Sequence, residues 1–151
     1  MEPKRKGIKR HEALYPLSHH HHHALFLALK LRRAGTEKSE LTIDELKKEL
    51  AQFWNEGGNQ HFREEEEILL PVYAQYQSVE DGEITEMLLE HIKIRSLVDK
   101  IAKTEQDLIV LMQDLGNQLE AHIRREERII FPMIEEALPE EVLVEMGPYL
   151  H

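Results

Sequence analysis

The sequence contains no cysteine among its 151 residues. This absence excludes disulfide bonds, iron–sulfur clusters held by cysteine and zinc sites built on thiolates. No apolar run reaches the roughly 20 residues that a membrane-spanning helix needs. The basic residues Lys4, Arg5 and Lys6 are not followed by an apolar segment. We therefore expect no secretory signal and predict a cytoplasmic location.

Positive charge is also scarce. The chain has 19 lysines and arginines against 29 acidic residues, which gives a formal net charge of −10 at pH 7. This balance disfavours nucleic acid or an anionic membrane as a partner, and it leaves any protein partner unknown. The length predicts one domain with a substantial core. We expect residues 1–10 to form a basic N-terminal arm and residues 11–151 to form a helical bundle.

Four long segments carry apolar residues at steps of three and four, which is the pattern of amphipathic helices. These predicted helices span about 11–34, 43–76, 83–103 and 105–137. A short last helix follows Pro139 and ends near Gly147. Short connections between long helices favour an all-α, up-down-up-down four-helix bundle.

One pattern occurs twice, as HFREEEEILLP in residues 61–71 and as HIRREERIIFP in residues 122–132. Positions four residues apart share one face of a helix. Each copy therefore places a histidine beside a carboxylate, on the apolar face of its helix. The two pairs are His61 with Glu65 and His122 with Glu126.

The apolar stripes are expected to continue past these glutamates through Ile68 in the first copy and Ile129 in the second. Pro71 and Pro132 each follow the histidine by ten residues and predict a kink or an opened last turn. Residues 57–58 are both glycine and interrupt the second helix one turn before the first pair. They indicate a kink, a close helix approach or room for a small ligand.

A run of five histidines, residues 19–23, lies inside the first predicted helix. Its place within an apolar pattern, away from either terminus, disfavours its interpretation as a purification tag. His21 shares the main apolar stripe with Leu17 and is the preferred core residue. His22, the alternative, shares a neighbouring apolar line with Phe26.

The third predicted helix places His91 on a stripe with Leu88 and Arg95. A guanidinium stays protonated and cannot bind a cation. We expect Arg95 either to donate hydrogen bonds to the carboxylate of Glu65 or Glu126 or to extend to the end of the bundle. The glutamates around the first pair, at positions 64, 66 and 67, are interpreted as a solvated face, with Glu66 alternatively orienting a ligand.

Six ionisable side chains thus occupy positions where a bundle helix usually carries leucine. Buried charges are normally paired or bound to metal, so a metal centre is predicted. Imidazoles and carboxylates without thiolates suit iron, manganese or zinc, and six donors fit two ions bridged by carboxylates. Without metal, the facing carboxylates are expected to raise the pKa of at least one of them. The predicted metal ligands are His21, His61, Glu65, His91, His122 and Glu126.

The sequence resembles the hemerythrin-like, or HHE cation-binding, domains from about Pro16 to Glu136. The resemblance is carried by the two repeated segments, 61–71 and 122–132, and by the pair Glu90-His91. It implies a centre of two iron ions in a four-helix bundle, with zinc or manganese as substitutes. The family's known roles imply a protein that binds or senses O2, nitric oxide or iron, so an enzymatic activity is not the leading expectation.

Three departures separate this chain from the oxygen-carrying members that it resembles, and one is that their first-helix histidine does not lie in a run of five. Those members have a second histidine where Arg95 stands, and an aspartate five residues after the fourth-helix histidine, where this chain has Glu126 at four and Glu127 at five. The set of four histidines and two glutamates is more similar to the iron-responsive branch, found in a ubiquitin-ligase F-box protein. Two alternatives stay open: an oxidase or peroxidase type of di-iron enzyme, and a structural bundle with adventitious metal.

Overall fold

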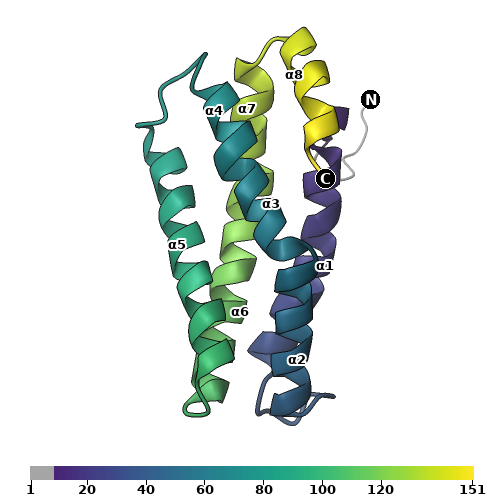
Figure 1. Cartoon of the computed structure of the whole chain (residues 1–151), viewed down its shortest axis with the longest axis vertical. Coiled ribbons are helices and arrows are strands. Elements are labelled where there is room, and N and C mark those ends of the chain that lie inside the picture. Colours follow the sequence, from purple (N-terminus) through teal and green to yellow (C-terminus); the bar gives the residue numbers. More distant parts are fainter. Residues whose placement is uncertain (1–8) are drawn as a thin grey trace, which may run out of the picture.

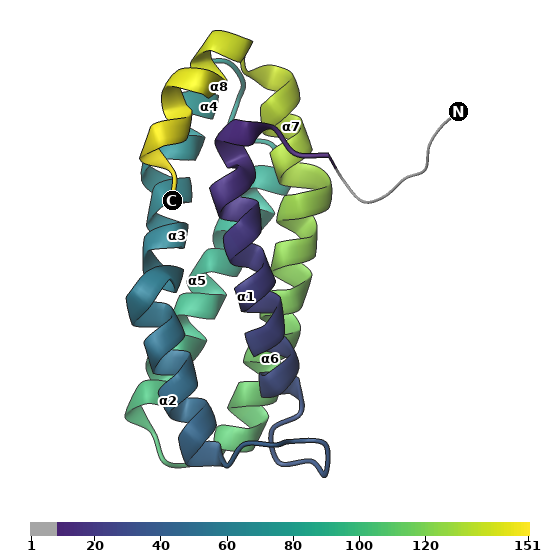
Figure 2. The same cartoon turned by 90° about the vertical axis from the view of Figure 1, so that its right-hand side faces the viewer.

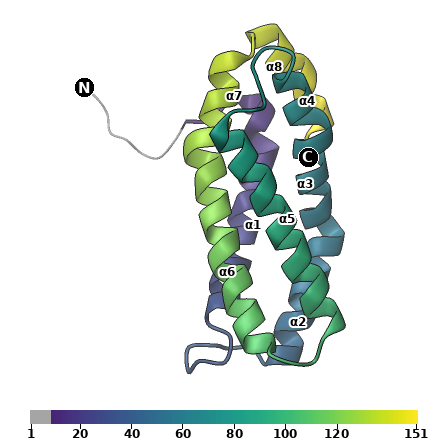
Figure 3. The same cartoon turned by 90° about the vertical axis from the view of Figure 1, so that its left-hand side faces the viewer.

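The computed structural model describes residues 9–151, and the described part of the chain contains helices and no β-strand. The helices form four long columns, which lie side by side with a short helix at one end (Figures 1 to 3). The all-α, up-down-up-down bundle predicted from the sequence is confirmed. Among residues 9–151, no helix is both long enough and apolar enough to span a membrane. Residues 1–8 of the expected basic arm lie outside the described residues.

The first column is α1 (Tyr15–Arg32), which follows a single 3-10 turn, η1 (Glu12–Leu14). The third column is one uninterrupted helix, α5 (Gly82–Lys103). The second and fourth columns each combine α-helical segments with π turns, in which backbone hydrogen bonds join residues five apart. The second contains α2 (Ile43–Phe53), η2 (Trp54–Gly58), α3 (Asn59–Glu64), η3 (Glu65–Leu69) and α4 (Leu70–Tyr73). The fourth contains α6 (Leu108–Arg125), η4 (Glu126–Ile130) and α7 (Phe131–Ala137), followed by α8 (Glu140–Met146) and the 3-10 turn η5 (Gly147–Tyr149).

Capping side chains fix where the second and third columns begin. The Thr42 side chain accepts from the backbone N–H of Glu45, whose carboxylate in turn accepts from the N–H of Thr42. This reciprocal capping box fixes the start of α2. The carboxylate of Asp81 accepts from the N–H of Glu83 and begins α5 in the same manner.

Two apolar clusters fill the bundle, and the six predicted ligands lie between them. The α2-side cluster contains Leu27, Leu31, Leu46, Leu50, Ile94, Ile101, Met112 and Leu115, among others. The α8-side cluster contains Leu14, Leu17, Leu69, Ile84, Met87, Phe131, Ile134 and Leu143, among others. The predicted ligands are therefore screened from water along the bundle axis in both directions.

Gly116 allows α1 and α6 to approach closely on the α2 side of the bundle. A Cβ atom at this position would lie 2.7 Å from the backbone oxygen of Ala28 and 2.9 Å from the backbone nitrogen of Arg32. The backbone of α1 therefore occupies the space that any larger residue would need.

The π turns η3 and η4, which begin at the two glutamates, correct the predicted stripes beyond them. Leu69 and Ile130 are fully buried, whereas Ile129, expected in the core, is 37% exposed. The N–H of Leu70 bonds to the carbonyl of Glu65, five residues back, so one extra residue enters the turn. Each of these two turns shifts every following position by one residue, and a proline is the second residue after it. The predicted opening of the helix near each proline thus takes the form of a π turn.

The stripe of α5 was also predicted one residue out of phase on both sides of His91. Met87 and Ile94 are buried where Leu88 and Arg95 had been expected to face the core. Steps of three and four allow either choice. An isoleucine gains more from burial than an arginine, so Ile94 takes the core position.

Candidate metal centre

All six predicted ligands come together in the middle of the bundle. Each of the four columns contributes at least one of them, and the second and fourth columns contribute a histidine and a glutamate each. The two glutamates are completely buried, and no histidine of the set is more than 4% exposed. The six are His21 on α1, His61 on α3, Glu65 on η3, His91 on α5, His122 on α6 and Glu126 on η4.

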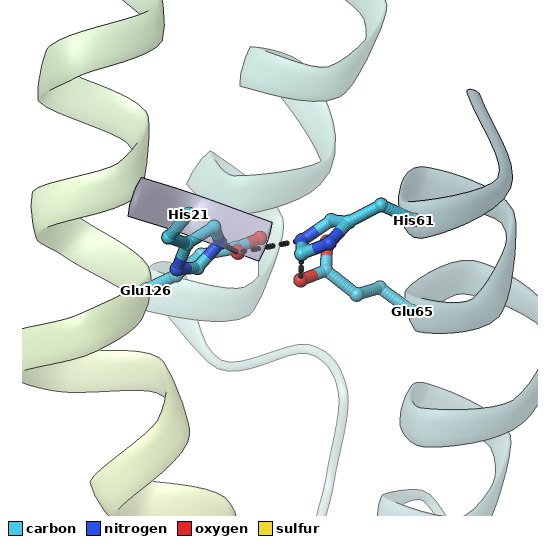
Figure 4. Close-up of side chains that lie close together, drawn as sticks. All are labelled: His21, His61, Glu65 and Glu126. Atoms are coloured by element: carbon cyan, nitrogen blue, oxygen red, sulfur yellow. Dashed lines mark hydrogen bonds and ion pairs between the residues drawn. The ribbon is translucent and has the colours of Figure 1, made fainter. Parts of the chain in front are cut away.

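These side chains form two overlapping groups of four. In each group, one ligand atom from every residue lies within 4.8 Å of the other three. Figure 4 shows the first group, in which side chains from opposite columns point toward one another. Both groups contain the same two carboxylates. The groups are His21, His61, Glu65 and Glu126, and Glu65, His91, His122 and Glu126.

Glu126 lies between all four imidazoles. Its Oε1 atom is 2.9 Å from Nε2 of His21 and 3.8 Å from Nε2 of His61. Its Oε2 atom is 2.9 Å from Nε2 of His122 and 3.4 Å from Nε2 of His91. Each oxygen therefore faces one pair of histidines, which is the arrangement of a carboxylate that bridges two cations.

Glu65 divides its oxygens in the same way. Its Oε2 atom lies 3.0 Å from Nε2 of His61, and its Oε1 atom lies 3.0 Å from Nε2 of His91. Among the described residues, both oxygens of Glu65 and the Nε2 atoms of His61 and His122 are buried without any contact of hydrogen-bonding geometry. Buried polar atoms without a partner are costly, and cations at the two groups would satisfy all four of them. The donor set therefore fits two metal ions.

A second set of carboxylates holds the far side of three imidazoles. Nδ1 of His21 lies 2.6 Å from Oε2 of Glu127, and Nδ1 of His91 lies 2.6 Å from Oε2 of Glu66. Nδ1 of His122 lies 2.8 Å from Oε1 of Glu90. A hydrogen bond at Nδ1 fixes the ring orientation and leaves Nε2 for a metal, so these outer carboxylates match the second layer of a metal site. They are Glu66, Glu90 and Glu127.

Basic side chains hold the outer carboxylates in turn. Arg10 donates to Oε1 of Glu127 at 3.1 Å, so the last residue of the expected basic arm is packed against the bundle. The Nε of Arg125 donates to Oε2 of Glu90 at 2.9 Å. The orientations of His21 and His122 are thereby fixed by a short series of charge-assisted hydrogen bonds.

Arg95 contacts an outer carboxylate, which corrects the prediction that it would reach Glu65 or Glu126. It donates to Oε1 of Glu66 at 3.2 Å and to Oδ1 of Asn59 at 2.6 Å, and its side chain is 32% exposed. This arginine therefore contacts the centre indirectly, through Glu66 and the imidazole that lies beside Glu66.

The outer carboxylates were predicted from the sequence only in part. Glu66 orients a ligand, as the alternative prediction stated, whereas Glu64 is buried and lies 2.7 Å from Nδ1 of His151 instead of facing solvent. The available signal was the second glutamate of each Glu-Glu pair, since Glu66 and Glu127 occupy the same position in the two copies of the repeat.

The run of histidines divides between the two sides of α1. His21 is 3% exposed and belongs to the first group of four, whereas His22 is exposed to solvent. His20 is half-buried, and its ring stacks on that of His61 with centroids 4.9 Å apart. His61 has no partner at Nδ1 among the described residues, so stacking takes the place of the hydrogen bond that orients the other three imidazoles.

Burial alone would lower the pKa of the central histidines, but the carboxylates beside them reverse this effect. Glu65 and Glu126 raise the pKa of His61 to about 10 and contribute to raising that of His91 to about 11. The pKa of His122 rises to about 9. Although burial opposes the change, the surrounding imidazoles hold the pKa of Glu126 well below its usual range. The expected rise in a carboxylate pKa is therefore wrong for Glu126, because imidazoles surround it.

An apolar cavity of about 20 Å³ adjoins the two groups on their α2 side. Its volume is enough for one water-sized molecule. The imidazoles of His61 and His122 form part of its wall, and most of the remaining wall is apolar. Those apolar residues include Ala24, Leu50, Trp54, Phe62, Ile94, Val98, Leu115 and Leu119.

Comparisons with known proteins agree with this geometry. A curated relative, the iron-sulfur cluster repair protein YtfE of Enterobacter sp. (strain 638), is 28% identical over 120 residues. The matched region is 78% of this chain and 53% of the relative, so the chain spans about half the length of that protein. No solved structure matches the chain. The sequence pattern of the Hemerythrin HHE cation binding domain matches residues 14–134, which include all six central side chains, and the chain belongs to this family of cation-binding domains.

Proposed function

We propose that this domain holds two iron ions and uses them to bind or sense a small diatomic molecule, O2 or nitric oxide. One observation carries the proposal: the two groups of four ligands share both of their carboxylates, Glu65 and Glu126. A single ion in one group would leave the two buried imidazoles of the other group without a cation.

The residues divide naturally between two cations. His21 and His61 would hold one ion, His91 and His122 would hold the other, and the two glutamates would bridge them. Four imidazoles with two carboxylates and no thiolate suit iron, with manganese or zinc as substitutes. The outer carboxylates would keep each Nε2 directed inward while the apolar clusters exclude water.

When bound, an iron pair supplies ligand binding and one-electron redox chemistry. The protein supplies a small apolar space beside it, bounded partly by His61 and His122. Such a cavity favours a small molecule of low polarity over a charged substrate. Arg95 stands where the oxygen carriers have a fifth imidazole, and its side chain is directed to Glu66. The proposed ligand set therefore contains four imidazoles. This favours sensing or consumption of the diatomic molecule over its reversible carriage.

A second candidate function is participation in iron–sulfur cluster repair. It is supported by the name of the relative from Enterobacter sp. (strain 638). The chain itself has no cysteine, so a cluster could not be held here by thiolates. In this function the domain would bind iron or nitric oxide while another protein carried the cluster.

The test is metal stoichiometry followed by ligand binding. The metal-free chain is loaded anaerobically with Fe²⁺, freed of excess metal and analysed for iron. We expect about two ions per chain in the wild type, because the six donors complete two sites only when the carboxylates bridge. A content of one ion or fewer would overturn the dinuclear proposal.

The loaded protein is then mixed with nitric oxide or with O2 and followed by absorbance. A new spectrum that requires iron and is absent from the zinc-loaded protein supports a diatomic ligand. Identical spectra before and after both gases would reject the sensing function and leave metal binding alone.

A further inference from the structure

The histidine run contains four residues that the proposed metal centre does not use as ligands. His19, His22 and His23 are exposed, and His20 is half-buried between the surface and the centre. The imidazoles of residues 19–23 on α1 therefore extend from bulk solvent to the buried predicted ligands. The spacing of these rings indicates what they do together.

The outermost pair consists of His19 and His23, which are four residues apart on α1. Their ring centroids lie 5.6 Å apart. Positions four apart share one face of a helix, and two histidines at this spacing can bind one divalent transition-metal ion together. This pair is accessible to an ion in solution because both side chains are exposed.

The series continues inward through His20. The centroid of its ring lies 6.4 Å from that of His23 and 4.9 Å from that of His61, a predicted ligand of the first group. His20 also stacks on Phe53, with centroids 5.3 Å apart. Successive imidazole rings therefore connect the exposed pair to the centre, and the widest separation between their centroids is 6.4 Å.

Gly57 makes room for the ring of His20. A Cβ atom at this position would lie 3.0 Å from Nε2 of His20, closer than side chains normally pack. The φ angle of Gly57 is 179°, an extended value that other residues adopt, so the backbone conformation does not itself require glycine. The space needed by the imidazole of His20 explains the glycine. Close approach of a neighbouring helix was one of the alternatives that the sequence left open.

We propose that His19, His23 and His20 form the path by which a divalent transition-metal ion reaches the buried centre. The inference rests on the proposed function, since a path needs a destination. His19 and His23 capture the ion, and His20 passes it to His61 by exchange of one imidazole ligand for the next. The protons that the ion displaces from the imidazoles pass to solvent, and no oxidant or reductant is required. Imidazole suits this role because it binds first-row divalent ions yet exchanges them.

The test compares loading rates with final metal content. Metal-free wild type, the double variant His19→Ala/His23→Ala and the control His22→Ala are mixed anaerobically with Fe²⁺. Samples are stopped at intervals with an excess of chelator, desalted and analysed for retained iron. His22 is the matched control because it is exposed on the same helix. Its ring lies 6.1 Å from that of His19 but has no ring contact with His20 or His23 among the described residues, so its removal leaves the His19–His23 pair intact.

We expect the double variant to load roughly tenfold more slowly, because captured ions reach the centre within one molecule rather than from bulk solution. Its final iron content should equal that of the wild type, and His22→Ala should match the wild type in both respects. Equal rates in the double variant and the wild type would overturn the path. Failure of the wild type itself to load would instead reject the proposed function.

The inner step has its own variant. Gly57→Ala places a methyl group against His20 and should slow loading. Gly82→Ala should not, because no atom lies within 4 Å of a Cβ added at that position. An unchanged loading rate in Gly57→Ala would remove His20 from the series and overturn a continuous path.

Discussion

The Nδ1 atom of His91 lies 2.6 Å from Oε2 of Glu66, the residue that directly follows the central carboxylate Glu65. The second copy of the repeat reproduces this relationship. Glu127 directly follows Glu126 and lies 2.6 Å from Nδ1 of His21. Each Glu-Glu pair therefore gives its first carboxylate to the centre and its second to an imidazole from a neighbouring helix.

The first prediction concerns these second glutamates. Glu66→Ala and Glu127→Ala should each weaken metal binding by about 10- to 100-fold, because an imidazole loses the partner that orients it. Glu67→Ala is the matched control, since Glu67 is exposed and contacts Arg63 on its own column. Affinity is measured by competition with an Fe²⁺ chelator. If Glu66→Ala retained the affinity of Glu67→Ala, the proposed role of the outer carboxylates would be wrong.

The second prediction separates two adjacent histidines. His21→Ala should lose roughly half of the bound metal, because His21 belongs to only one of the two groups of ligands. His22→Ala should retain the full metal content, because this side chain faces solvent. Iron analysis after equal loading gives the answer. The reverse ranking would show that α1 is rotated relative to the structure described above.

The third prediction is a pH dependence of the metal-free chain. The pKa of His61 is raised to about 10 and that of His91 to about 11, from an ordinary value of 6.5. Their stabilising effect is complete below pH 6.5 and is lost as the pH rises toward 11, because the unfolded chain releases these protons first. Thermal denaturation of chelated protein should therefore give a falling Tm from pH 7 to pH 10.

A control for this pH dependence is available at the centre. Glu126→Gln removes the charge that Glu126 presents to all four imidazoles, so its Tm should depend less on pH over the same interval. A wild-type Tm that stays constant from pH 7 to pH 10 would contradict the protonated state of the metal-free centre.

The fourth prediction concerns helix packing away from the metal ligands. Gly116→Ala should lower the free energy of unfolding by about 1–3 kcal/mol, because its methyl group meets the backbone of α1. Gly82→Ala should change it by no more than about 0.5 kcal/mol, since no atom lies within 4 Å of a Cβ built there. Urea denaturation of both variants in the same metal state provides the comparison. A neutral Gly116→Ala would show that the two helices can separate freely.

The convergence of the six central side chains could be predicted from sequence because a histidine and a glutamate four residues apart on an apolar face need buried partners. The phase of the helices after Glu65 and Glu126 could not. A π turn changes which backbone carbonyl accepts each hydrogen bond, and among the residues concerned only the proline that follows gives a sign of it. Arg95 was misplaced for a related reason, since steps of three and four around His91 allow two stripes. Burial of Ile94 decides between them, and that is a property of the packed bundle.

The π turn η4 also constrains which sequence changes the fourth column can accept. Successive residues of an α-helix point about 100° apart, so one extra residue in the turn gives Glu126 and Phe131 directions that a regular helix could not combine. Both side chains are fully buried as a result, Glu126 at the centre and Phe131 in the α8-side cluster. A deletion of one residue within 126–130 would remove this combination of directions, because either the carboxylate or the aromatic ring would have to turn away from its present neighbours. Residues at the α8 end of the bundle can thus be substituted, whereas the number of residues between Glu126 and Phe131 is fixed.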